Sequence, residues 1–193
     1  RGADEALVLV KLSANEAAFP RLRGEMEDLC ATYPELLSGA GYGGYVSYEA
    51  LLQRHVALHR PLYLRMTLDL DAGAERGLAN EELLLAAYDG DVPTALIERL
   101  FDYGRYLLLC SSRAGGLPAN LQGVWNGDYF PAWASDYHND ENIQMNYWQA
   151  LPGNMPEVTL PYFDYYASML EDYRLNARNV YGCRGVLAPI AQS

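Results

Sequence analysis

The chain has 193 residues, half of them hydrophobic and a fifth charged, a composition typical of a folded domain with a sizeable core. Its formal net charge of −11 comes without any cluster of basic residues, which excludes nucleic acid as a partner and favours a neutral ligand. The longest apolar run near the start falls far short of the roughly 20 residues of a membrane helix, so no membrane partner is predicted. The sequence that begins at Arg1 lacks the basic, apolar and small-residue succession of a signal peptide. We therefore expect it to be an internal part of a longer chain.

Hydrophobic periodicity predicts a short strand, a helical connector and then a series of helices. The run "ALVLVKL" at 6–12 is typical of a strand. A helix is expected from Ser13 or Asn15 onward, followed by a glycine-rich loop at 39–45. Alternation of apolar and polar residues predicts a strand at 62–71. The other predicted helices cover 47–63, 80–90, 92–113, 141–151 and 155–182.

Single residues are expected to set several helix boundaries. Asn80 is the predicted N-cap of the helix at 80–90, and Gly90 is its stop. Pro152 is expected to end the helix before it, because proline cannot continue a helix. Pro161 is the expected position of a kink in the long helix at 155–182.

The sequence predicts neither a metal site nor a cofactor. Cys30, Cys110 and Cys183 are widely spaced and odd in number, so they match no zinc pattern or disulfide framework and are interpreted as buried free thiols. His55 and His59 stand four residues apart on a predicted helix, a spacing that a metal pair also uses. The glutamate of an HExxH motif is missing, so packing and hydrogen bonding in the connector are favoured.

A long irregular stretch at 114–137 carries carboxamides and indoles together, and a loop of this length inside a compact domain is usually functional. Amides bind sugar hydroxyls as donor and acceptor, while an indole face covers the apolar side of a sugar ring. The alternative is a packed loop whose polar side chains form hydrogen bonds with its own backbone. The composition of the loop alone does not decide between sugar binding and this structural role. The candidate sugar-binding residues here are Asn120, Gln122, Trp125, Asn126 and Trp133.

The polar run after this loop concentrates several reactive groups. If 138–142 is extended, alternate side chains share a face, so His138, Asp140 and Asn142 point the same way. Helix capping near the start of the next helix is the alternative, although a cap needs only one such residue. Metal binding by His138, Asp140 and Glu141 is disfavoured, because sequence neighbours diverge on an extended chain and no second histidine is near.

Two runs resemble a known family: "FDYGRYLLLCSSRAGGLPANLQGVWN" at 101–126 and "DYHNDENIQMNYWQAL" at 136–151. Both are similar to glycoside hydrolase family 95, which contains inverting α-L-fucosidases and related α-L-galactosidases. The resemblance is dense from about residue 95 to 160 and looser upstream. The family's N-x-N-x-[EQ]-M-N-Y-W signature falls on Asp140, Asn142, Gln144, Met145, Asn146, Tyr147 and Trp148.

The resemblance implies a mainly α chain with three parts. Residues 1–12 would be the C-terminal end of a β-sandwich domain, 13–75 a helical linker with a short strand, and 76–193 the early helices of a truncated (α/α)6 barrel. In the family, two asparagines hold the attacking water and a nearby histidine binds the sugar. By position, Asn142 would be the second water-holding amide and His138 the sugar-binding histidine. A secreted or periplasmic location is suggested by the resemblance alone.

Asp140 departs from the family pattern, since it stands where the first asparagine is usual. A carboxylate there can accept the proton of the water as a general base, or it can mark a different sugar preference or subfamily. Asp140 and Asn142 are therefore the candidate catalytic residues. Glu141 is a candidate substrate contact, although the preferred interpretation is a first-turn acid favoured by the helix dipole.

The prediction is thus a fragment of an inverting exo-glycosidase that removes terminal α-L-fucosyl or α-L-galactosyl residues from a glycan. Inversion needs an acid roughly 6.5–9.5 Å from the base, and the family's acid lies beyond this chain, so the fragment alone is expected to be inactive. A degenerate homologue that binds carbohydrate without turnover is one alternative. Another (α/α)6 barrel enzyme, such as a glycoside phosphorylase, is a second.

Overall fold

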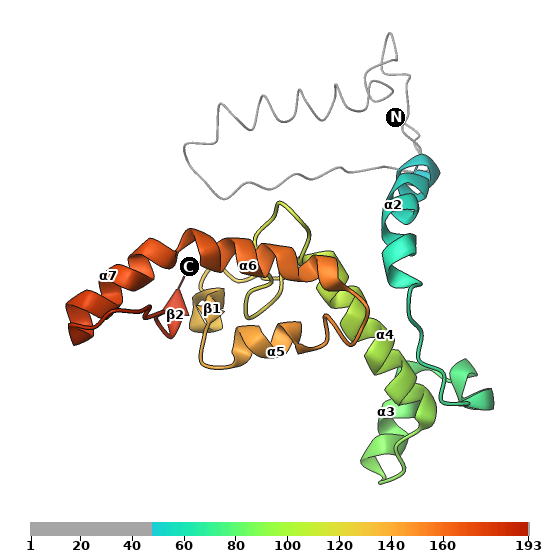
Figure 1. The fold of residues 1–193 in the computed structure, drawn as a ribbon. Helices are drawn as coiled ribbons and strands as arrows, with labels where there is room; N and C mark the ends of the chain where they lie inside the picture. The colour runs from blue at the N-terminus through green and yellow to red at the C-terminus, as the bar shows by residue number, and fades with distance from the viewer. Residues whose placement is uncertain (1–47, 193) are drawn as a thin grey trace, which may run out of the picture. The chain divides into compact units, whose positions relative to one another are not determined.

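The computed structural model describes residues 48–192, and these residues are mainly helical, as the sequence predicts (Figure 1). The predicted elements at 6–12, from Ser13 or Asn15, and at 39–45 lie outside the described residues, as does Cys30. The α-helices are α2 (Tyr48–Tyr63), α3 (Asn80–Tyr88), α4 (Thr94–Ser111), α5 (Asn142–Trp148), α6 (Thr159–Ser168) and α7 (Leu170–Tyr181). The short elements are η3 (Gly73–Gly77), η4 (Ala132–Ser135), η5 (Pro156–Val158), β1 (Tyr137–His138) and β2 (Ala191–Gln192).

One compact unit runs from His59 to the end of the chain and contains two hydrophobic clusters. The smaller cluster forms where α3 packs on the start of α4, around Leu83, Ala95 and Leu96. The larger cluster joins the second half of α4 to α5 and α6. Its buried members are Leu108, Leu109, Ala119, Tyr137, Ile143, Tyr147, Ala150, Met155, Val158 and Tyr165.

Beside the smaller cluster, Glu98 of α4 fixes the segment that precedes α3. The Arg76 guanidinium donates to both carboxylate oxygens of Glu98, with N–O distances of 2.8 Å, and the Leu70 N–H donates at 2.7 Å. The hydrogen bonds from Arg76 lower the pKa of Glu98 to about 2. The carboxylate therefore stays ionised and ties 70–76 to α4.

The strand predicted at 62–71 is wrong. Residues 66–72 form no regular secondary structure, and within the described part of the chain they pair with no strand. Two of their backbone groups bond to side chains instead. Arg105 donates to the Met66 carbonyl, and the Leu70 N–H donates to the Glu98 carboxylate. Alternation indicates which side chains face a core, but it does not supply the neighbouring strand that a sheet requires.

Arg105 in α4 is the most buried charged residue of the described chain, with 1% of its surface exposed. Its Nε donates to the Gly153 carbonyl at 3.0 Å, and Nη1 donates to the carbonyls of Tyr63 at 2.8 Å and Met66 at 2.9 Å. Nη2 reaches the Leu62 carbonyl at 3.4 Å. The cation therefore lies at the C-terminal end of α2, where the helix dipole favours positive charge.

A short hydrogen-bonded chain crosses the larger cluster through Tyr147 of α5. The Ser112 hydroxyl donates its one hydrogen to the Val158 carbonyl at 2.7 Å, so the Tyr147 hydroxyl, 2.7 Å away, must donate to Ser112. Tyr147 in turn accepts from the Ala119 N–H at 2.8 Å. Burial raises the pKa of Tyr147, which keeps the donating proton in place. The end of α4, the following loop, α5 and η5 are thereby joined.

The predicted helices at 47–63, 80–90 and 92–113 are confirmed, with differences at their ends. Asn80 is the first helical residue rather than the cap, and its Oδ1 accepts from Arg99 at 2.6 Å. The cap residue is Ala79, whose N–H donates to the Glu82 carboxylate at 2.7 Å. The helix predicted at 141–151 is shorter and ends at Trp148.

The long helix predicted at 155–182 is divided into η5, α6 and α7, and the break is at Met169 rather than at Pro161. Pro161 lies in the first turn of α6, where its missing N–H leaves no helical hydrogen bond unmade. At Met169 the N–H instead bonds three residues back, to the Tyr166 carbonyl at 3.2 Å. Proline position alone therefore does not predict the break.

The end of the described chain returns to the polar run. β2 pairs antiparallel with β1, with Tyr137 opposite Gln192 and His138 opposite Ala191. The Asn139 N–H donates to the Ile190 carbonyl at 2.6 Å, which extends the pairing by one residue. None of the helices from 48 to 192 combines the length and apolarity needed to span a bilayer. Cys110 is half-buried and Cys183 is exposed, so the prediction of a buried thiol is wrong for Cys183.

We predict that Arg105→Leu lowers the free energy of unfolding by about 3 kcal/mol or more, because an unsatisfied buried carbonyl costs about 1–3 kcal/mol. Urea denaturation measures the change. Arg174→Leu is the matched control, since Arg174 pairs with Glu171 on the exposed face of α7 and such pairs contribute less than about 1 kcal/mol. Equal losses in the two variants would contradict the role of Arg105.

Candidate functional site

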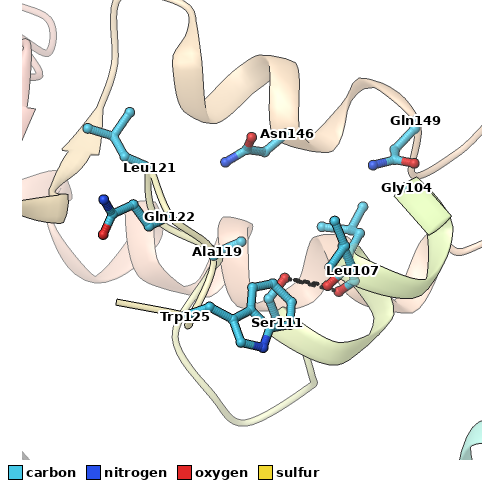
Figure 2. A pocket seen from close by; sticks show the side chains of 11 residues that line it. Gly104, Leu107, Ser111, Ala119, Leu121, Gln122, Trp125, Asn146 and Gln149 are labelled. Atoms are coloured by element: carbon cyan, nitrogen blue, oxygen red, sulfur yellow. Dashed lines mark hydrogen bonds between the residues drawn. The ribbon is translucent and has the colours of Figure 1, made fainter. Parts of the chain in front are cut away.

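A cavity of about 360 Å³ lies between α4, the loop at 119–125 and α5. Figure 2 shows Asn146 and Gln149 on the α5 side and Gln122 and Trp125 on the loop. Gly104 and Ser111 of α4 contribute to its lining, and the Ser111 hydroxyl donates to the Leu107 carbonyl at 2.8 Å. The volume lies within the range of small-molecule sites. Among residues 48–192, no ionisable side chain lines the cavity, so this lining suits a neutral ligand.

Three carboxamides in the cavity retain unused hydrogen-bonding capacity. The Gln122 Oε1 is buried and accepts no hydrogen bond within the described residues. Asn146 donates from Nδ2 to the Asn120 carbonyl at 3.1 Å, which leaves its Oδ1 available. The side chain of Gln149 bonds to no described residue. Because buried polar groups are normally paired, the Gln122 oxygen indicates a position for a donor such as a hydroxyl.

The indole of Trp125 lies over Gly123, and this contact requires glycine. Gly123 has a φ of +67°, and a Cβ at this position would stand 2.6 Å from the Trp125 ring. The Asn120 and Gly123 backbones exchange hydrogen bonds of 3.3 and 3.0 Å, so the turn between them is tight. Half of the Trp125 surface, 51%, remains exposed and can cover a ring of a ligand.

Asn120 and Asn126 differ from the other candidate residues, because their oxygens bond within the loop. The Asn120 Oδ1 accepts from the Gln122 N–H at 2.9 Å and from the Ser135 hydroxyl at 3.1 Å. The Asn126 Oδ1 accepts from the Asp128 N–H at 3.0 Å. Both side chains therefore stabilise turns, as the alternative interpretation of the loop expected.

His138 forms a largely buried pair with Asp136, with its Nδ1 2.7 Å from the carboxylate and exposed fractions of 16% and 12%. The Trp133 ring lies against the imidazole, edge to face, at 5.6 Å between centroids. The Asp136 hydrogen bond raises the pKa of His138, burial opposes it, and the charges of Asp136 and Asp140 reinforce it. Because Nδ1 is held by Asp136, the orientation of the ring is fixed, and the second nitrogen, Nε2, can bind a ligand oxygen.

The prediction that His138, Asp140 and Asn142 share one face of an extended run is wrong. Only Tyr137 and His138 are extended; a turn follows, with a φ of +131° at Glu141, and Asn142 begins α5. The turn is fixed by Gln144, which accepts from the Glu141 N–H at 3.1 Å and donates to the Asn139 carbonyl at 2.8 Å. The alternation of His138, Asp140 and Asn142 in the sequence did not predict this turn at Glu141.

The three groups therefore face different surroundings. Asp140 is exposed and lines a second cavity of about 420 Å³ together with Tyr162, Tyr166 and Pro189. Asn142 and Glu141 are exposed at the start of α5, and neither caps the helix with its side chain. In the part of the chain that the structure describes, no cluster of three or more His, Cys, Asp or Glu side chains has the geometry of a metal site.

Sequence reasoning missed Asn146 and Gln149 as site residues, although a signal was present. Together with Asn142 they stand at positions i, i+4 and i+7, so one face carries two carboxamides of α5 and that of its C-cap residue, Gln149. The apolar residues Ile143 and Tyr147 occupy the buried face. The helix predicted at 141–151 already contained this row, but only Asn142 was taken from it as a site residue.

We predict that Gly123→Ala displaces the Trp125 indole, because the left-handed backbone and the 2.6 Å contact leave no room for a methyl group. Acrylamide quenching of tryptophan fluorescence and near-UV circular dichroism measure the displacement. Gly127→Ala is the matched control in the same loop, since a Cβ there meets nothing within 4 Å. Identical spectra for the two variants would show that Trp125 is not held by Gly123.

We further predict that Asp136→Asn lowers the pKa of His138, since the variant loses the hydrogen bond that stabilises the imidazolium. NMR titration of the histidine ring measures it. Asp140→Asn should lower this pKa less, because Asp140 acts only through its charge. In the unchanged chain the pair contributes stability below the ordinary histidine pKa of about 6.5, and this contribution is lost as the pH rises through the raised value. A pKa unmoved by Asp136→Asn would refute the pairing.

The described part of the chain is similar to known proteins. A profile described as "Glycosyl hydrolase family 95 catalytic domain" matches residues 47–192. The chain is 39% identical over 146 residues to "Alpha-L-fucosidase 2" of Arabidopsis thaliana, an alignment that covers 74% of this chain. It is 38% identical over 138 residues to "Probable alpha-fucosidase A" of Aspergillus niger, covering 70% of this chain.

A third relative, "Probable alpha-fucosidase A" of Aspergillus oryzae, is 39% identical over 124 residues, or 62% of this chain. In each alignment the chain spans 17% of the relative's own length. The profile covers both sequence runs and every residue of the cavity. On this similarity, the chain belongs to glycosyl hydrolase family 95.

Proposed function

We propose that the full-length protein is an exo-glycosidase that hydrolyses terminal α-L-fucosyl or α-L-galactosyl residues of a glycan with inversion. The observation that carries the proposal is the similarity, over 146 residues, to a protein named as an α-L-fucosidase. The uncharged cavity beside Trp125 and the acidic net charge support a neutral sugar substrate. The mainly helical chain supports the expected architecture.

In this architecture α3 to α7 are early helices of an (α/α)6 barrel that occupies 76–193. Residues 1–12 belong to the end of a β-sandwich domain, and 13–75 form the linker. The general acid comes from the remainder of the protein, since an inverting pair of carboxyl groups stands about 6.5–9.5 Å apart across the sugar. The chain by itself is inactive.

The attacking water is held by Asn142 and deprotonated by Asp140. Asn142 is exposed in the first turn of α5, and Asp140 is exposed in the turn that precedes this helix, so solvent reaches both side chains. His138 binds a sugar hydroxyl through Nε2, which the Asp136 bond leaves available. Trp125 and Trp133 cover the apolar face of the sugar, with 51% and 75% of their surfaces exposed. Glu141 is a further substrate contact.

One rival function is favoured by a specific observation. The carboxylate of Asp140 replaces the usual amide of the family, which fits a homologue that binds carbohydrate without turnover. Titration of fucose and galactose into the full-length protein separates the two, because binding without hydrolysis supports this rival. A glycoside phosphorylase would show a rate that depends on inorganic phosphate.

We predict that the full-length protein hydrolyses an aryl α-L-fucoside and that Asn142→Ala lowers kcat at least about 100-fold, the lower end of the effect of acid–base machinery. Asp140→Ala, which removes the proposed base, should lower kcat to a similar extent. Asn179→Ala, an exposed amide on α7, is the control and should retain full activity. Undiminished turnover in Asn142→Ala would overturn the assigned role, and absence of turnover in the unchanged protein would overturn the function.

A further inference from the structure

Three arginines line a separate cavity of about 390 Å³ at the C-terminal end of α7. Arg174 and Arg178 come from the helix, and Arg184 comes from the segment that follows it. They are the only lysines or arginines after Arg113, in a stretch that carries eight aspartates and glutamates. Because four and six residues separate the three along the chain, the sequence shows no basic cluster, and only the fold brings them to one place.

A reversal of the chain at Gly182 returns Arg184 to the side of the helix. Gly182 has a left-handed φ of +65° and its N–H donates to the Arg178 carbonyl at 2.9 Å, while the Cys183 N–H donates to the Ala177 carbonyl at 3.3 Å. Backbone groups therefore cap these two carbonyls at the end of α7. The guanidinium groups are not needed for this purpose and remain available for another partner.

A second anchor holds the segment that carries Arg184. The Leu187 N–H donates to the Tyr173 carbonyl at 2.9 Å, and the Asn176 side chain donates to the Leu187 carbonyl at 3.4 Å. Figure 1 shows the chain running back along α7 from its end toward β2. Residues 184–186 thus lie between two points that are fixed on the helix, so Arg184 is held at the cavity by the backbone around it.

The positive charge at this cavity is largely unpaired. Arg174 forms an ion pair with Glu171, but Arg178 and Arg184 form no hydrogen bond or ion pair with any residue from 48 to 192. Three cations and one carboxylate leave a local net charge of +2. Arg174 and Arg178 stand one helical turn apart, where like charges repel. A bound anion would remove this repulsion.

The chemistry of the three side chains selects the kind of anion. The planar fork of N–H donors on a guanidinium binds two oxygens of an oxyanion at once, a geometry that phosphate offers. A phosphate group carries a charge of about −1.5 to −2 at pH 7, which matches the local charge, whereas a carboxylate would neutralise only half of it. The cavity is larger than one phosphate ion, so it also has room for a sugar that carries a phosphate group.

We propose that Arg174, Arg178 and Arg184 form a binding site for a doubly charged tetrahedral oxyanion, of which phosphate is the representative. The anion is either free phosphate or a phosphate monoester of a sugar, and both present the same group to the arginines. The site is independent of the proposed glycosidase function, because it is detected by binding and not by turnover.

Equilibrium dialysis of radiolabelled inorganic phosphate against the full-length protein at pH 7.5 and low, constant ionic strength tests the site. The unchanged protein should bind phosphate saturably. Arg178→Gln and Arg184→Gln should each raise the Kd by about 2- to 5-fold, the factor for one exposed ion pair, and the double variant by about 4- to 25-fold. Arg113→Gln, an exposed arginine outside the lining, is the control and should keep the Kd. Absence of saturable binding, or an unchanged Kd in the double variant, overturns the proposal.

The thiol of Cys183 reports whether the anion lies in this cavity, because it is exposed and belongs to the lining. Phosphate should slow the alkylation of Cys183 by iodoacetamide, with a midpoint that follows the Kd and rises in the double variant. Cys110, which is half-buried in α4, is the internal control and should react at an unchanged rate. Peptide mass spectrometry measures both rates. Equal slowing of both thiols, or slowing of neither, contradicts the location.

Competition against the labelled phosphate distinguishes the two sources. Displacement by galactose 6-phosphate at a lower concentration than by unlabelled phosphate identifies a sugar monoester, and displacement only at a higher concentration identifies the free ion. Galactose should displace nothing, and displacement by this uncharged sugar would refute recognition of an oxyanion. Hydrolysis of an aryl α-L-fucoside is measured in parallel. Phosphate binding without hydrolysis would refute only the proposed function, and hydrolysis without phosphate binding only the oxyanion site.

Discussion

The described fold depends on one buried cation, Arg105, whose N–H groups donate to backbone carbonyl oxygens rather than to a carboxylate. Its guanidinium bonds to the backbone at 62–66, at the end of α2, and to Gly153, which follows α5. The planar fork of N–H donors can satisfy several acceptors at once, which a lysine cannot. α4 is therefore the helix to which these other segments are bonded. At the C-terminal end of α4, the hydrogen bonds of Tyr147 attach α5 and the following loop in a similar way.

Attachment at both ends of α4 has a direct effect on the cavity. Gly104 and Ser111 lie on the same helix as Arg105 and next to Ser112, so the α4 wall is fixed by bonds made outside the cavity. The opposite wall, α5, is fixed through Tyr147, while the Oδ1 of Asn146 remains available for a further hydrogen bond. Rigid walls and unused polar groups are what a preorganised binding site requires.

Helices with strong periodicity were predictable from the sequence, and two of the residues singled out in the loop, Gln122 and Trp125, line one cavity. Three features were not. The strand at 62–71 failed because pairing depends on a partner that local alternation does not contain, and the break at Met169 has no proline or glycine to mark it. The reversal at Glu141 depends on Gln144 and on β2, about fifty residues further along the chain, so the surroundings of His138 and Asp140 followed from tertiary contacts.

The absence of titratable groups from the cavity lining has a consequence for how the protein responds to acidity. Affinity for a sugar held there is set by amides and an indole, none of which changes protonation across the physiological range. His138 lies outside this lining, and its pKa is raised by the hydrogen bond to Asp136, so the charge on this imidazole does change with acidity. On the proposed function, acidification would therefore change the charge on His138 while leaving the amides and the indole of the cavity unaltered.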